Sequence, residues 1–204
     1  MKQIHGAALA ALALVLAGTA ALAQSGPPVR IRGTVDSVEG QALAVTSRAG
    51  EKFKLALSPD TGVNLIVPAK ITDIKDNSYI GTAAMPQPDG LLVALEVHIF
   101  PEAMRGVGDG SRPFDLKPQS TMTNGTAANV TVSGVDDRAL TVKYKDGEKK
   151  LMVPKDAPIV TYAPGDKAML KAGGHVIIFA AKQADGSLLA QRISLGKDGL
   201  VPPM

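Results

Sequence analysis

The sequence predicts an all-β protein that is built from two copies of one small unit. Short segments in which apolar and polar residues alternate recur along the chain, separated by Gly-Glu and Asp-Gly turns, and such alternation is typical of half-buried strands. Residues 34–52 match residues 131–149 at a constant offset of 97, with 9 of 19 positions identical. The match continues at an offset of 96 as far as residue 190, so we expect both copies to share one fold.

The first copy contains a predicted three-stranded meander, a short helical turn and two longer strands. The meander covers residues 31–38, 42–46 and 53–57, and an apolar piece at 63–67 follows it. Residues 71–77 have helical spacing, and the two closing strands at 79–85 and 91–100 flank an Asp-Gly hairpin signal. The second copy repeats the series at residues 130–135, 139–144, 150–153, 159–162, 167–171, 176–182 and 188–195.

Three strands, a short helical insertion and two strands is the strand order of the OB-fold, a five-stranded Greek-key barrel. We therefore predict two tandem five-stranded OB-like small barrels related by internal duplication, each with a short helical turn before its last two strands. A different small barrel or an open sandwich of the same strands is the alternative. Each copy spans roughly 65–70 residues, a size at which a lone core is marginally stable. We therefore expect the two barrels to pack on each other through an apolar face.

The chain divides into four expected segments. Residues 1–23 are a predicted signal peptide, with Lys2 before an apolar run and an Ala-Leu-Ala cleavage motif ahead of Gln24. The first barrel repeat is placed at 24–100, a non-repeated connecting loop at 101–126, and the second repeat with a C-terminal tail at 127–204. Cleavage near Ala23/Gln24 would deliver a periplasmic or secreted protein. No later segment approaches the roughly 20 apolar residues of a membrane span, so no membrane insertion is expected.

Composition argues against several function classes. The net charge is +3 with both signs interspersed, and the few aromatic residues (Tyr79, Tyr144, Tyr162 and Phe179 among them) are scattered, which disfavours nucleic-acid binding. The absence of cysteine removes disulfides, thiolate metal sites and thiol nucleophiles. No nucleophile elbow or comparable catalytic motif is present. Glu96 and Glu102 could be general acids on spacing alone, but acids near strand ends are usually solvated, and we expect that here. We therefore expect neither enzyme activity nor a cofactor.

The loop at 101–126 has no counterpart after the second copy, and long irregular loops in compact domains usually have a reason to exist. One interpretation is a lid or binding loop across the barrel interface. The other is an ordered linker whose charged residues pair locally and whose Phe100 and Phe114 dock on the barrels. The candidate binding residues are its polar side chains, Glu102, Arg105, Asp109, Arg112, Asp115, Thr121, Thr123 and Asn124.

A metal site is a second hypothesis, because only two histidines lie outside the predicted signal peptide. His98 ends the last strand of the first copy close to Glu102 and Met104, and His175 opens the fourth strand of the second copy. Histidine with glutamate suits zinc or copper, and methionine adds copper(I) character. No HxH, HxxxH or paired-methionine motif accompanies them.

The repeat pattern resembles an uncharacterised family of exported bacterial proteins with OB-like domains. The residues that carry the resemblance are the segments 98–106, 120–124 and 196–204, together with the Gly-Glu-Lys turns and the Asp-Gly-x-Leu-x-Ala hairpins. Members of this family often carry the label "metal ABC transporter permease", which this sequence contradicts, since a permease needs several membrane spans. The resemblance implies a fold and no catalytic residues.

These observations together predict a non-catalytic exported binding or scaffold module, whose partner is an unknown periplasmic protein or small ligand held in the groove between the barrels. The alternative is a periplasmic metal-binding protein. Features shared by both copies are explained by building the fold. Function is therefore expected where the copies differ, at His98 against Ser194, at His175 against Tyr79, and in the non-repeated loop.

Overall fold

The computed structural model describes residues 28–133 and 137–204, and the predicted signal peptide lies outside them. The protein is all-β, as predicted, and contains a five-stranded barrel with further strands. Helical structure in the described residues is limited to four three-residue 3-10 turns: η1 (Ile71–Asp73), η2 (Glu102–Met104), η3 (Lys167–Met169) and η4 (Lys197–Gly199). The helical spacing at 71–77 and 167–171 is therefore realised only as η1 and η3.

Strand pairing closes two rings of five strands each. The β1 ring runs in the order β1-β2-β3-β13-β12 and returns to β1, and the β5 ring runs β5-β6-β10-β9-β8 and returns to β5. The strands of the β1 ring are β1 (Val29–Glu39), β2 (Ala42–Ser47), β3 (Lys52–Ala56), β12 (His175–Lys182) and β13 (Leu188–Gly196). Those of the β5 ring are β5 (Tyr79–Pro86), β6 (Leu92–Ile99), β8 (Thr121–Ser133), β9 (Asp137–Tyr144) and β10 (Gly147–Met152).

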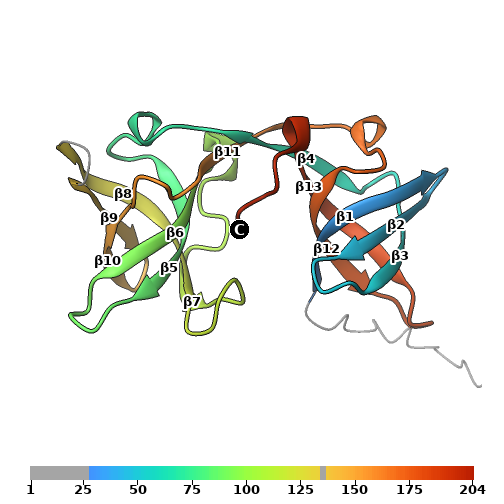
Figure 1. Ribbon diagram of the computed structural model, residues 1–204, viewed down its shortest axis with the longest axis horizontal. Coiled ribbons are helices and arrows are strands. Elements are labelled where there is room, and N and C mark those ends of the chain that lie inside the picture. Colours follow the sequence, from blue (N-terminus) through green and yellow to red (C-terminus); the bar gives the residue numbers. More distant parts are fainter. Residues whose placement is uncertain (1–27, 134–136) are drawn as a thin grey trace, which may run out of the picture.

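Each ring takes three strands from one half of the chain and two from the other. The expectation that residues 24–100 and 127–204 each close their own barrel is therefore wrong, because the closing strands are exchanged between the halves. Figure 1 shows β12 and β13, late in the sequence, beside the early strands β1 to β3. The hairpins β5–β6 and β12–β13 have the same pairing and the same bulge position, so either could close a ring with similar contacts, and for that reason the repeat pattern does not reveal the exchange.

The exchange passes through two extended connectors, β4 (Gly62–Pro68) and β11 (Ile159–Pro164). They pair antiparallel with each other, and each also pairs in parallel with the last strand of a ring, β4 with β13 and β11 with β6. In the β4–β11 register Ile66 lies opposite Tyr162, and these residues are equivalent at the offset of 96. An approximate twofold axis therefore passes through this pair, and Figure 1 shows the two connectors spanning the rings.

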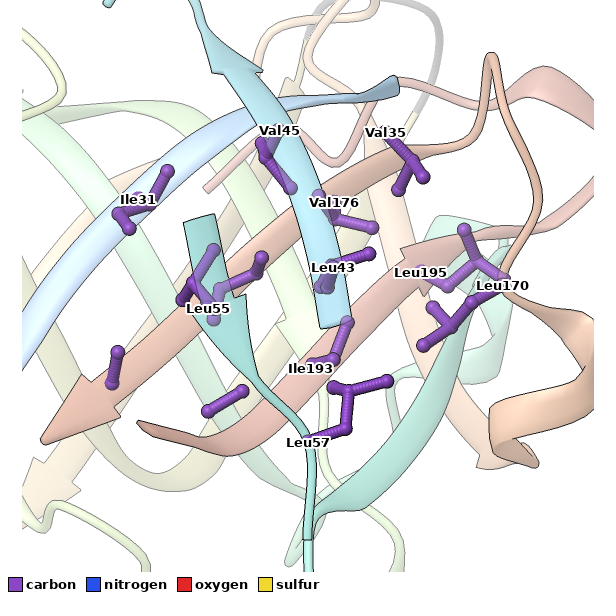
Figure 2. Packing of buried hydrophobic residues seen from close by; sticks show 13 residues of the cluster. Ile31, Val35, Leu43, Val45, Leu55, Leu57, Leu170, Val176, Ile193 and Leu195 are labelled. Atoms are coloured by element: carbon purple, nitrogen blue, oxygen red, sulfur yellow. The ribbon is translucent and has the colours of Figure 1, made fainter. Parts of the chain in front are cut away.

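Residues from both halves of the chain fill the interior of each ring. The core of the β1 ring, drawn in Figure 2, packs Ile31, Val35, Leu43, Val45, Leu55 and Leu57 against Leu170, Val176, Ile178, Ala180, Ala190, Ile193 and Leu195. Burying one such aliphatic side chain contributes about 1.5–3 kcal/mol. A third cluster joins the rings to each other, with Ala83 and Met122 from one side and Ile177 from the other. The rings thus bury an apolar face between them, as expected.

The segment 101–126 is not entirely non-repeated. Its last six residues begin β8, and a further strand, β7 (Gly110–Pro113), pairs with them. Gly33 of β1 faces Val176, and Gly125 of β8 faces Ile80, the residue equivalent to Val176. The start of β8 therefore matches β1 at an offset of 92, and the offset of 97 holds only after β8, because the second copy has five extra residues here.

Candidate functional site

A cavity of about 200 Å³ lies where the two rings face each other. Its walls come from both rings, from the segment after Phe100 and from the C-terminal tail: Arg30, Arg32, His98, Phe100, Met104, Val107, Gly108, Arg112, Phe114, Met122, Asn124, Tyr162, Ile177, Phe179, Arg192, Ser194 and Met204. Three pairs of these residues occupy equivalent positions in the two rings: Arg30 and Met122, Arg32 and Asn124, and His98 and Ser194. The cavity therefore lies at the approximate twofold axis.

The wall contributed by the β1 ring is cationic. Arg30 and Arg192 lie over the ring of Phe179, with the guanidinium carbons 5.4 and 4.5 Å from its centroid. Phe114, from the segment between the rings, lies 4.8 Å from the guanidinium carbon of Arg30 and 5.3 Å from that of Arg32. Cation–π contacts of this kind hold the guanidinium groups in place while leaving their N–H donors free to bind acceptors.

Asp115 is the one acid that forms ion pairs with this cationic wall among the described residues. Its carboxylate accepts hydrogen bonds from Arg30 Nη1 at 2.6 Å and from Arg32 Nη2 at 2.8 Å. The hydrogen bond from Arg32 leads the causes that lower the pKa of Asp115 to about 2. These ion pairs hold the segment between the rings against the β1 ring, although the chain continues from Asp115 into β8, a strand of the β5 ring.

The wall contributed by the β5 ring carries a buried acid and a histidine. Glu96 is fully buried, and its Oε1 accepts the backbone N–H of Ala83 at 2.7 Å. Its Oε2 lies 2.9 Å from Nδ1 of His98, which is 3% exposed. A histidine whose Nδ1–H donates to a carboxylate presents its Nε2 as an acceptor in the neutral tautomer.

Asn124 stands beside this histidine. Its Nδ2 donates to the carbonyl of Val107 at 3.0 Å, but its Oδ1 is buried and has no hydrogen-bond partner in the described structure. Gly81 brings the two side chains together, because a Cβ at this glycine would lie 2.6 Å from Asn124 Oδ1 and would collide with His98 Nε2. The β5 ring therefore places two acceptor atoms next to each other over Gly81, on two residues that line the cavity.

Aromatic rings connect the two walls. Phe100 stacks on Tyr162, with centroids 5.5 Å apart and planes at 13°, and His98 meets Phe100 edge-on at 4.8 Å. Burial and the nearby Glu96 carboxylate raise the pKa of the Tyr162 hydroxyl above its ordinary value, and Arg192 opposes them. Tyr162 thus lies within the electrostatic reach of both the acidic and the cationic wall.

Of the eight predicted binding residues, Arg112 and Asn124 line the cavity, and Asp115 holds two of its arginines. Glu102 instead pairs with Arg105, whose hydrogen bond to it is the leading cause that lowers the pKa of Glu102. Asp109 accepts from the backbone N–H of Lys145. Thr121 and Thr123 are strand residues of β8, and the Thr123 hydroxyl lies 3.0 Å from that of Ser111. Local pairing and cavity lining thus both occur in this segment.

The four predicted metal ligands do not meet in one place. His98 and Met104 line the cavity, whereas Glu102 is bound to Arg105 and His175 Nδ1 lies 3.1 Å from the hydroxyl of Thr34. Within the described ranges no group of three or more His, Cys, Asp or Glu side chains is placed to hold a metal ion.

The sequence reasoning missed the residues that give the cavity its chemistry. Arg30, Arg32 and Arg192 were unassigned, and Glu96 was expected to be a solvated acid. The aromatic residues also looked scattered, yet Tyr162 and Phe179 line one cavity. One signal was available, since Glu96 and Arg192 are equivalent at the offset of 96 and carry opposite charges.

We predict that Asp115→Asn weakens folding modestly and in a pH-dependent way. Because the folded-state pKa of Asp115 is depressed, its contribution is present above about pH 4 and is lost as the pH falls toward 2. The side chain is 58% exposed, so solvent screening limits the loss at pH 7 to roughly 0.5–1 kcal/mol. Urea unfolding of both proteins from pH 7 down to pH 3 should show the difference shrinking. Asp146→Asn, at an exposed residue with a 3.8 Å ion pair, should show no such trend, and an equal loss at every pH would contradict the explanation.

No protein-family model, curated protein or solved structure matches this chain. No helix among residues 28–133 and 137–204 has the length and apolar character needed to cross a bilayer.

Proposed function

We propose that this protein is a non-catalytic binding module that holds a small ligand in the cavity between its two rings. The carrying observation is that both rings and the segment after Phe100 supply walls to one cavity at the twofold axis. Typical sites for drug-sized molecules occupy roughly 300–1,000 Å³. A cavity of about 200 Å³ therefore suits a small metabolite better than a protein partner.

Residues 1–23 carry the pattern of a signal peptide, so we propose an exported, periplasmic or secreted protein. We further propose that the two rings descend from one duplicated OB-like unit whose closing strands were exchanged. The matched bulges support this, because Ala83/Ala84 in β5 and Phe179/Ala180 in β12 interrupt the pairing at equivalent positions.

Binding is favoured over catalysis by the surroundings of His98. The Glu96–His98 pair could orient a general base, but among the described residues no serine or threonine hydroxyl forms a hydrogen bond with His98. Ser194 lines the same cavity without such a bond. The pair therefore lacks a nucleophile of its own.

A thermal-shift screen tests the proposal. The purified protein would be heated with a panel of small metabolites and with zinc and copper salts. A ligand at about 100 times its Kd should add roughly 2.7 kcal/mol of stability, or about 5–10 °C in Tm. Ser194→Phe, which fills the cavity, should abolish the shift, whereas Ser187→Phe on an exposed turn should keep it. An empty panel, or a shift that survives Ser194→Phe, would contradict a ligand site in this cavity.

A further inference from the structure

The two walls of the cavity are equivalent by position and differ in chemistry. Arg192 of the β1 ring corresponds to Glu96 of the β5 ring at the offset of 96. Arg32 corresponds to Asn124 at the offset of 92. A symmetric ligand would meet matching groups at both ends of such a site, and this cavity does not offer them. The asymmetry indicates a ligand whose two ends differ.

The cationic wall calls for an acid. Guanidinium groups are donors only, and they bind carboxylates and phosphates in bidentate geometry. Arg192 of this wall lines the cavity without an ion pair to any acid among the described residues. Arg112 also lines the cavity without such a pair, but it belongs to β7, which pairs with β8 of the β5 ring. Arg30 and Arg32 share a single side-chain carboxylate, that of Asp115, and Arg32 Nε also donates to the Met204 oxygen at 2.9 Å. Arg192 is therefore the guanidinium of this wall that has no hydrogen-bonded acceptor among the described residues.

The opposite wall calls for a hydrogen-bond donor. Asn124 is 4% exposed, and its unpartnered Oδ1 can only accept. His98 Nε2 lies beside it over Gly81, and it is a second acceptor in the neutral tautomer whose Nδ1–H donates to Glu96. Leaving a buried acceptor unpaired costs free energy that a donor from a ligand would recover. A hydroxyl or an ammonium group fits this pair of acceptors.

We infer, on the basis of the proposed binding function, that the ligand is a small organic acid that also carries a hydroxyl or ammonium donor. It lies across the twofold axis with its acid on the arginines of the β1 ring and its donor on His98 and Asn124. The rings of Phe100 and Tyr162 pack beside it, between the two walls. Hydroxy acids and amino acids share this chemistry, and the experiment separates them.

Matched three-carbon probes test the inference by calorimetry on the full-length processed protein. Lactate carries the acid and a hydroxyl, alanine carries the acid and an ammonium, propionate carries the acid alone, and alaninol carries donors without the acid. We expect lactate or alanine to bind about tenfold or more tightly than propionate and alaninol, because buried acceptors discriminate against a ligand that lacks the donor. Whichever of lactate and alanine binds identifies the donor.

Two variants assign the ends of the ligand. Asn124→Leu should reduce the preference over propionate to within about threefold, and Arg192→Met should weaken binding of every acid about tenfold. Arg192 is half-buried, so its variant should fold even if Asn124→Leu does not. Arg138→Met changes an arginine outside the cavity, so it should leave both the preference over propionate and the affinity for the acids unchanged.

Two outcomes would overturn the inference. If propionate binds as tightly as lactate and alanine, the site does not recognise a donor on the ligand. If alaninol binds more tightly than lactate and alanine, the site does not recognise an acid. If all four probes fail while another compound gives a shift that Ser194→Phe abolishes, the binding function stands and the ligand class is wrong. If nothing binds in either experiment, both proposals fail.

Discussion

Gly33→Ala and Gly125→Ala should each destabilise the fold by about 3 kcal/mol, at the upper end of ordinary overpacking effects. A Cβ at Gly33 would collide with the carbonyl oxygen of Thr46 and lie 2.9 Å from its carbon. At Gly125 it would meet the carbonyl of Lys143 in the same way. These obstacles are backbone atoms in a neighbouring strand, so neither substitution can be relieved by a side-chain rotation. Chemical denaturation of the two variants measures both losses.

Gly62→Ala is the matched control, since its nearest neighbour would lie 3.9 Å from the new Cβ. Removing glycine's extra freedom in the unfolded chain should there leave stability unchanged or raise it by up to about 1 kcal/mol. Equal losses at Gly33 and Gly125 would support their structural equivalence at the offset of 92. A loss at only one of them would show that the two rings do not share this close approach of β1 to β2 and of β8 to β9.

Glu96→Ala should cost about 2–6 kcal/mol, because it leaves two buried donors without their acceptor, at roughly 1–3 kcal/mol each. The Ala83 N–H and His98 Nδ1 would both lose their acceptor inside the protein. Urea unfolding of the variant at pH 7 measures the loss.

Arg192→Ala provides the comparison, because Arg192 occupies the equivalent position in the other ring but is only half-buried. It should cost less than about 1 kcal/mol, as most partly exposed substitutions do. Similar losses of unfolding free energy for the two variants would mean that the buried hydrogen bonds of Glu96 do not stabilise the fold more than the half-buried Arg192 does.

The strands were predictable from sequence because local chemistry determines them. Alternation in residues 31–38 and the Asp89-Gly90 hairpin place β1 and the β5–β6 turn where the structure has them. Gly90 has φ +83°, a conformation in which glycine avoids the strain of a side chain. These signals depend on neighbours in the chain and not on distant partners.

The repeat register at β8 was not predictable, because two alignments score alike. Thr34, Val35 and Val38 match at an offset of 97, and Gly33, Thr34 and Val38 match at 92, so each alignment has three identities. The strand registers and the contact of Gly125 with Lys143 select the second. The strand exchange was hidden for a related reason, since a strand from either copy presents the same apolar face to a ring.

The site was predicted in part. Comparing the copies pointed to His98 and Ser194, which line the cavity together. The cationic wall was missed because Arg30, Arg32 and Arg192 come from strands at opposite ends of the sequence. They become neighbours only when β13 and β12 join β1, so the cavity depends on the exchange.

The most direct test of this account is a pair of engineered disulfides that report which strands are neighbours. Thr34 lies opposite His175 in the exchanged arrangement, whereas unexchanged barrels would place His175 opposite Thr126. The protein has no cysteine, so Thr34→Cys/His175→Cys and Thr126→Cys/His175→Cys each introduce a single possible bond. After mild oxidation, non-reducing gels and peptide mass spectrometry should find a disulfide within one chain only in the first pair. A bond in the second pair and none in the first would contradict strand exchange, and with it the cavity that the exchange creates.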